Sequence, residues 1–278
     1  MAVLNNQNSS FAFQHLVCPE THSDLEFTDQ GLRSTDSGKI YAVENGIPIF
    51  SEPEAEPADE NEAIAFRKRY EWQYQHGQDA SNYDESFKTS ARKRQRTRRE
   101  LEIMSELLGS QGHIQSLLDI PCGGGRLTGP MLERCENLIE ADISMAQLQL
   151  ALNTHQEQGK NKTEGMIASA ISIPLASNSV DGVVCARLTH HLPEPEERAK
   201  LVSELLRVAK SFVVVSFTDK NSIQSWSRKL RGKSLNPCAM PVSELENLTS
   251  KGNAVLKKIM TVSSIGPRHR FALLEKRS

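Results

Sequence analysis

The sequence predicts an α/β fold with a mainly parallel sheet, and three observations point to it. Five short apolar segments alternate with helical patterns between residues 114 and 217, as expected for strands joined by helical crossovers. An apolar segment that ends at Asp119 is followed by three consecutive glycines, Gly123 to Gly125. Another apolar segment ends on a second carboxylate, Asp142, about 20 residues further on.

Length and composition narrow the class of protein. The 278 residues suffice for one large or two small domains. A formal net charge of −2 argues against a surface that binds nucleic acid over its whole area. Five cysteines without paired spacing favour a reducing compartment, so we expect a cytoplasmic protein. We expect no membrane span and no signal peptide, and the sequence leaves the oligomeric state open.

Five regions are predicted along the chain. Residues 1–10 are polar and expected to be disordered, and residues 11–50 are expected to form a small β-rich domain. The acidic, proline-bearing segment 51–60 is interpreted as a linker. Residues 61–112 are expected to form a helical cap, and residues 113–278 the main α/β domain.

Within these regions, the patterns predict individual elements. Strands of the small domain are expected at residues 11–17, 25–27, 39–43 and 47–50. Strands of the main domain are expected at residues 115–120, 137–142, 164–168, 181–186, 211–217, 255–264 and 269–275. Helices are expected at residues 85–108, 145–152, 196–209 and 242–252.

The glycine segment predicts a site for a nucleotide-like cofactor. Glycines let the backbone approach a ligand without a Cβ in the way, and the helix that follows points its N-terminus at the same place. A carboxylate at the end of the next strand, such as Asp142, suits a bidentate hydrogen bond to ribose hydroxyls. Dinucleotide-binding proteins share this arrangement.

The position of Asp119 favours a different cofactor from a dinucleotide. Dinucleotide-binding loops have the form G-x-G-x-x-G, whereas this chain has D-x-P-x-G-G-G, starting at Asp119. A carboxylate before the turn repels a pyrophosphate and attracts an ammonium group. The methionine part of S-adenosylmethionine (SAM) carries such an ammonium group.

At these residues the chain resembles the class I SAM-dependent methyltransferases, in particular those of methyltransferase type 11. Asp119, Gly123 and Gly125 match the family's first motif, D-x-G-x-G-x-G, and Pro121 replaces its first glycine. Three further motifs follow in order, so the resemblance covers about residues 115–218. It implies a Rossmann-like, mainly parallel sheet of seven strands, flanked by helices and closed by an antiparallel pair.

The resemblance also implies the cofactor, SAM, and no metal. The cofactor-binding positions of the family correspond to Asp119, Cys122, Gly123, Gly125, Asp142, Ile143, Ser169 and Ala170. By this resemblance, Asp119 and the loop backbone hold the methionine part, and Asp142 holds the ribose. Ser169 replaces an aspartate of the family, so the adenine contact is expected from its hydroxyl and from the Ala170 backbone. Cys122 is interpreted as a packing residue.

Arg187, His190 and His191 are the catalytic candidates, because they follow the fourth strand at the carboxyl edge of the sheet. A histidine there is suited to take a proton from an acceptor hydroxyl or amine. The alternative is a histidine that packs at the start of a helix. Arg187 is expected either to orient an acidic acceptor group or to pair with a carboxylate near SAM.

We therefore expect methyl transfer from SAM to an O, N or C acceptor on a small molecule or lipid-like substrate. A basic run at residues 88–99 keeps an rRNA or tRNA base methyltransferase open as an alternative. Nucleic acid is less favoured, because stacking platforms need aromatic residues and these make up only 5% of the chain. A catalytically silent SAM-fold partner protein is the alternative outside the enzymes.

Residues 11–50 resemble the zinc-ribbon-like domain found in methyltransferase activator subunits and fused to some methyltransferases. That pattern places four thiolates, of which only Cys18 remains; Thr21, Ser34 and Ser37 occupy the other positions. Tetrahedral zinc needs about four strong ligands. We therefore expect a degenerate, metal-free domain that packs on the main domain.

Overall fold

The computed structural model describes residues 10–51, 90–156, 162–222, 230–231, 237–262 and 269–277. The predicted disordered N-terminus, the linker and the first part of the predicted cap, up to residue 89, lie almost entirely outside these residues. Among the described residues, no helix combines the length and apolar character that a membrane crossing requires.

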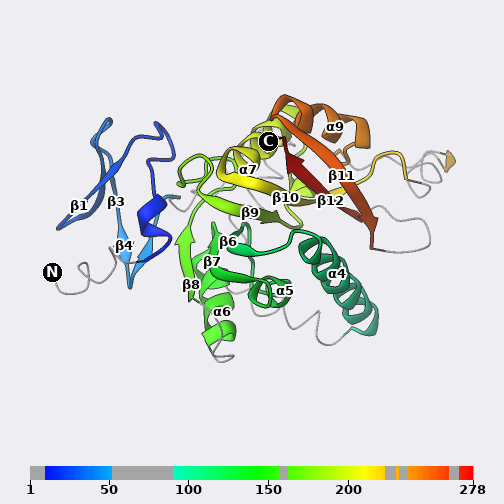
Figure 1. The fold of residues 1–278 in the computed structure, drawn as a ribbon, viewed down its shortest axis with the longest axis horizontal. Helices are drawn as coiled ribbons and strands as arrows, with labels where there is room; N and C mark the ends of the chain where they lie inside the picture. Colours follow the sequence, from blue (N-terminus) through cyan, green and yellow to red (C-terminus); the bar gives the residue numbers. More distant parts are fainter. Residues whose placement is uncertain are drawn as a thin grey trace.

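Seven strands form the central sheet in the order β11-β12-β10-β9-β6-β7-β8 (Figure 1). The parallel strands are β6 (Ile114–Asp119), β7 (Cys135–Asp142), β8 (Lys162–Ile167), β9 (Val180–Cys185) and β10 (Ala209–Thr218). The antiparallel pair at one edge is β11 (Ala254–Thr261) and β12 (His269–Lys276). The predicted α/β fold with a mainly parallel sheet of seven strands is confirmed.

Helices cover both faces of this sheet. They are α4 (Ala91–Gly109), α5 (Gly129–Leu132), α6 (Met145–Gln156), α7 (Pro195–Val208) and α9 (Val242–Lys251). The strands are therefore apolar on both sides: in β9, Val183 packs in one buried cluster and its neighbour Val184 packs in the other. This double burial explains the continuous apolar runs by which the strands were predicted.

A small N-terminal module precedes the main domain. It contains the short helix η1 (Phe13–His15), the antiparallel strands β1 (Leu25–Thr28), β2 (Gly31–Ser34) and β3 (Ile40–Tyr41), and the pair β4 (Val43–Glu44) and β5 (Ile47–Pro48). The strand predicted at residues 11–17 is wrong, because a 3₁₀ turn occupies its centre. Glu164 of β8 accepts hydrogen bonds from the Phe11 and Ala12 N–H groups, at 3.0 and 2.6 Å, and so removes them from any ladder.

The four positions compared with zinc ligands are occupied by a hydrogen-bonded network. Ser23 Oγ lies 2.9 Å from Thr21 Oγ1 and 3.0 Å from Ser34 Oγ, and Ser34 Oγ accepts a hydrogen bond from Ser37 N. Cys18 Sγ lies 3.2 Å from the hydroxyl of Tyr41. In the part of the chain that the structure describes, no group of three or more metal-ligating side chains is placed to hold an ion. The likeness to a zinc ribbon stays a prediction.

The N-terminal module is bonded to the edge of the main sheet at β8, as the adjacent blue and green elements of Figure 1 show. Ile49 bridges to Ile167 in a parallel register, and Phe50 N donates to the Ile167 carbonyl at 2.8 Å. The carboxylate of Glu164 also accepts a hydrogen bond from Ser10 Oγ at 2.6 Å. The module is therefore attached to the edge strand β8 by one isolated bridge at its last residue and by the hydrogen bonds of Glu164.

We predict that Glu164→Ala lowers the free energy of unfolding by about 2 kcal/mol, because hydrogen bonds to a charged acceptor contribute about 1.5–3 kcal/mol. Glu164→Gln should have a smaller effect, since the amide oxygen still accepts. Urea unfolding followed by circular dichroism measures the change. The exposed Glu133 is the control, and Glu133→Ala should stay within about 0.5 kcal/mol. Equal stability of Glu164→Ala and Glu133→Ala would contradict the role given to Glu164.

Candidate functional site

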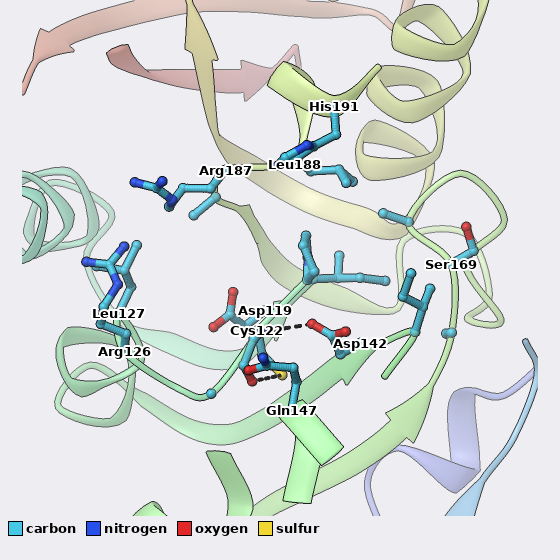
Figure 2. A pocket seen from close by; sticks show the side chains of 18 of the residues that line it. Asp119, Cys122, Arg126, Leu127, Asp142, Gln147, Ser169, Arg187, Leu188 and His191 are labelled. Carbon is cyan, nitrogen blue, oxygen red and sulfur yellow. Dashed lines mark hydrogen bonds between the residues drawn. The ribbon is translucent and has the colours of Figure 1, made fainter. Parts of the chain in front are cut away.

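A pocket opens at the carboxyl ends of β6, β7 and β9 (Figure 2), where ligands bind in open α/β sheets. Seven of the eight residues predicted to bind the cofactor line it, and so do the three catalytic candidates. The exception is Gly125, whose N–H donates to the Cys122 carbonyl at 3.2 Å within the glycine loop. The fold thus brings the candidates from four separate segments of the chain to one place.

Asp142 connects the glycine loop to the end of β7. Its Oδ2 accepts a hydrogen bond from Gly123 N at 2.9 Å, and its Oδ1 accepts one from Ser144 N at 3.0 Å. Gly123 has a φ of +55°, which side chains disfavour. Burial raises the pKa of the Asp142 carboxyl to about 6, although the N–H groups of Ser144 and Gly123 oppose the shift.

Asp119 and Glu140 place two buried carboxyl groups beside one hydroxyl. Thr128 Oγ1 lies 3.3 Å from Asp119 Oδ2 and 3.0 Å from Glu140 Oε1, and a single hydroxyl proton can donate fully to only one of them. Burial, reinforced by Glu140, raises the pKa of Asp119 well above its usual range. A cation bound in the pocket beside Asp119 would reverse that shift.

Cys122 lies between these carboxyl groups and stays a thiol. Burial and the charges of Asp142, Glu140 and Asp119 raise the pKa of the Cys122 thiol well above its usual range. Because the thiolate is the nucleophilic form, the environment opposes nucleophilic chemistry at this residue. The Cys122 side chain packs in a small apolar cluster with Leu148, Ala151 and Ile167, to which Ile49 of the N-terminal module also belongs.

Ser169 lies on the opposite side of the pocket from Arg126 and Arg187 (Figure 2), and Ala170, the next residue, also lines the pocket. Ala168 N donates to the Asp142 carbonyl at 3.0 Å, which joins this loop to β7. The N-terminal module holds the same loop further along, where Ser172 Oγ donates to the Pro19 carbonyl at 2.8 Å. The loop that lines this side of the pocket is therefore hydrogen-bonded both to β7 and to the N-terminal module.

Arg187 and His191 lie above Asp119 in Figure 2, and His190 lines the same pocket. Arg187 has a φ of +64°, and its N–H donates to Ser216 Oγ at 2.6 Å. Burial lowers the pKa of His190 to about 2 and of His191 to about 4, and Arg187 contributes to both shifts. Both imidazoles are therefore neutral at pH 7.

One functional residue was not predicted from the sequence: Glu100, a fully buried carboxylate of α4. Its Oε2 lies 2.8 Å from Nη1 of Arg126, and its Oε1 lies 3.0 Å from Nε of Arg96 and 3.3 Å from Nη1 of Arg187. Burial opposes ionisation, but these three guanidinium groups outweigh it and lower the pKa of Glu100. Its position in the helical pattern could have indicated its burial, because Glu100 precedes Ile103 by three positions and so lies on the same, buried face of the helix.

Comparison with known proteins matches this architecture to methyltransferases. Residues 118–215 match a family model described as a methyltransferase domain. The curated relatives include two ubiquinone biosynthesis O-methyltransferases. That of Idiomarina loihiensis is 27% identical over 112 residues, which make up 40% of this chain and 45% of the relative. That of Cupriavidus pinatubonensis is 30% identical over 107 residues, or 38% of this chain and 43% of the relative. The chain thus spans less than half the length of either.

Solved structures show the same fold. Magnesium protoporphyrin IX methyltransferase from Synechocystis, solved with bound SAH (S-adenosylhomocysteine), superposes with a TM-score of 0.58 at 16% identity, over 68% of this chain and 89% of that one. A SAM-dependent methyltransferase from Clostridium acetobutylicum gives a TM-score of 0.55 at 12% identity, over 65% of this chain and 92% of that one. Residues 118–215 thus match a methyltransferase domain, and they lie within a fold that solved methyltransferases share.

Proposed function

We propose that this chain transfers the methyl group of SAM to a small-molecule acceptor. One observation carries the proposal: a single pocket joins the Asp119 and Asp142 carboxyl groups to Arg187 and the neutral imidazoles of His190 and His191. When bound, SAM supplies an activated methyl group on a sulfonium. The protein then has mainly to bind and orient the two reactants.

Each chemical group of SAM has a proposed partner among the residues of the pocket. Asp142 is proposed to accept hydrogen bonds from the ribose hydroxyls, and Asp119 to pair with the methionine ammonium. The loop at Ser169 and Ala170 is proposed to meet the adenine amine, with Ile143 providing apolar surface beside it. Support comes from the chemistry of these two residues: burial raises the pKa of both carboxyl groups, and a bound ammonium group and hydroxyl donors would stabilise their ionised forms.

His190 and His191 are proposed to position the acceptor and to take its proton. Both present neutral imidazoles at pH 7, and Nδ1 of His190 has no hydrogen-bond partner among the described residues. The low pKa makes each a weak base in the ligand-free site. Proton transfer to either therefore depends on a bound acceptor that stabilises the imidazolium.

The names of the two curated relatives support oxygen as the acceptor atom and a small molecule as the acceptor, since both are called ubiquinone biosynthesis O-methyltransferases.

RNA is the second candidate substrate, because the start of α4 exposes Arg92, Lys93, Arg94 and Arg98. A salt-sensitive gel shift with RNA would favour that candidate. Failure to bind SAM or SAH would remove the cofactor assignment.

We predict that Asp142→Ala weakens the binding of SAH by about 100-fold, because two ribose hydrogen bonds to a buried carboxylate are lost. Asp142→Asn should weaken it by about tenfold, since the amide retains one acceptor oxygen. Isothermal titration calorimetry measures both. Asp29, exposed in the N-terminal module, provides the matched control, Asp29→Asn, which should bind SAH as the wild type does. A dissociation constant within threefold of wild type for Asp142→Ala would contradict the ribose assignment.

We predict that adenosine binding depends on pH through Asp142. Its carboxyl has a raised pKa of about 6, and ribose hydroxyls donate to the ionised form. Affinity should be constant above pH 6 and fall by up to tenfold for each pH unit below it. Adenosine lacks the ammonium that would engage Asp119, so it isolates this group. NMR titration between pH 5 and 8 measures the effect, and Asp142→Asn should abolish it. A pH-independent wild type would count against the assignment.

A further inference from the structure

One end of the pocket is built from arginines that surround a buried carboxylate. Arg126 and Arg187 line the pocket, and Glu100 lies behind them without exposure to solvent. Arg96 adds a third guanidinium to the same carboxylate. The side chains of Arg126 and Arg187 are 14% and 20% exposed, so both are held in the wall rather than extended into solvent.

The three guanidinium groups make this end of the pocket electropositive. Burial lowers the pKa of Arg96, and the charges of Arg187 and Arg126 act in the same direction. Burial also lowers the pKa of His269 to about 3, with Arg96 as the largest charge contribution. Cations crowded in a partly buried wall favour an anionic ligand, and guanidinium groups match carboxylates and phosphates in geometry.

The two arginines of the pocket differ in position. Arg126 directly follows the glycine loop, on the same side as Asp119, where the cofactor's methionine part is proposed to lie (Figure 2). Arg187 lies on the loop that carries His190 and His191, and Leu188 and His191 are next to it in the close-up. The left-handed backbone of Arg187 and its hydrogen bond to Ser216 fix the start of that loop.

We propose that Arg187, held by Glu100, binds an oxyanion of the methyl acceptor, of the carboxylate or phosphate class. The inference rests on the proposed function. SAM carries a single carboxylate, which one guanidinium pairs with in bidentate fashion, and Arg126 is placed for that pairing. Arg187 then faces the acceptor beside the imidazoles, so the acceptor is an acidic small molecule.

The test uses the full chain saturated with SAH and two probes of equal size, 4-hydroxybenzoate and the neutral 4-hydroxybenzamide. Ligand-observed NMR should show the acid binding at least tenfold more tightly than the amide. Arg187→Gln should reduce this preference to about one, and Arg187→Lys should retain part of it, because lysine keeps the charge without the planar fork. Circular dichroism establishes that each variant is folded.

Arg126→Gln is the matched control. It should weaken SAH binding by about tenfold and keep the preference for the acid, whereas Arg187→Gln should leave SAH affinity within threefold of wild type. The inference is overturned if the wild type binds acid and amide equally or binds neither. It is also overturned if Arg187→Gln weakens SAH and spares the probes, because the cofactor's own carboxylate then occupies the cluster. Absence of SAH binding in the wild type would instead reject the proposed function.

Discussion

The pocket depends on one carboxylate, that of Asp142, which fixes two chain segments to each other. Its two oxygens accept hydrogen bonds from the glycine loop and from the residue that starts α6. The backbone carbonyl of Asp142 accepts a third hydrogen bond, from the N–H of Ala168 on the opposite wall. A single residue therefore sets the spacing between three loops, and any ligand that adds contacts to its carboxylate acts on a geometry that is already formed.

Charge is distributed along the pocket in a definite order. Carboxyl groups occupy the centre and guanidinium groups occupy the end beyond Asp119, with neutral imidazoles beside them. Such an arrangement orients a ligand that carries both signs of charge, because reversing it would place like charges together. Glu100 is the reason that the arginines can share this end: without a buried anion between them, their mutual repulsion would push the side chains into solvent.

Most of the main domain could be predicted from the sequence, since strands buried on both faces leave uninterrupted apolar runs such as that ending at Asp119. Local patterns failed where distant residues decide the structure. The segment 11–17 has the composition of a strand, yet Glu164, far along the chain, takes its N–H groups. The association of Glu100 with Arg126 and Arg187 likewise depends on how the fold closes, so spacing alone could suggest a buried charge but not its partners.

The bonding of the N-terminal module to β8 affects how much of the sheet edge is open to pairing with another molecule. A parallel sheet ends in strands whose backbone groups can pair with another molecule, and exposed edges of this kind promote aggregation. At β8 the module supplies a partner within the same chain, through Ile49 and Phe50. At the other edge, β11 carries the exposed charges of Lys257 and Lys258. The module thus occupies the backbone of β8 at its last residue, Ile167, and a shortened chain that begins after it would leave that end of the edge strand open to pairing.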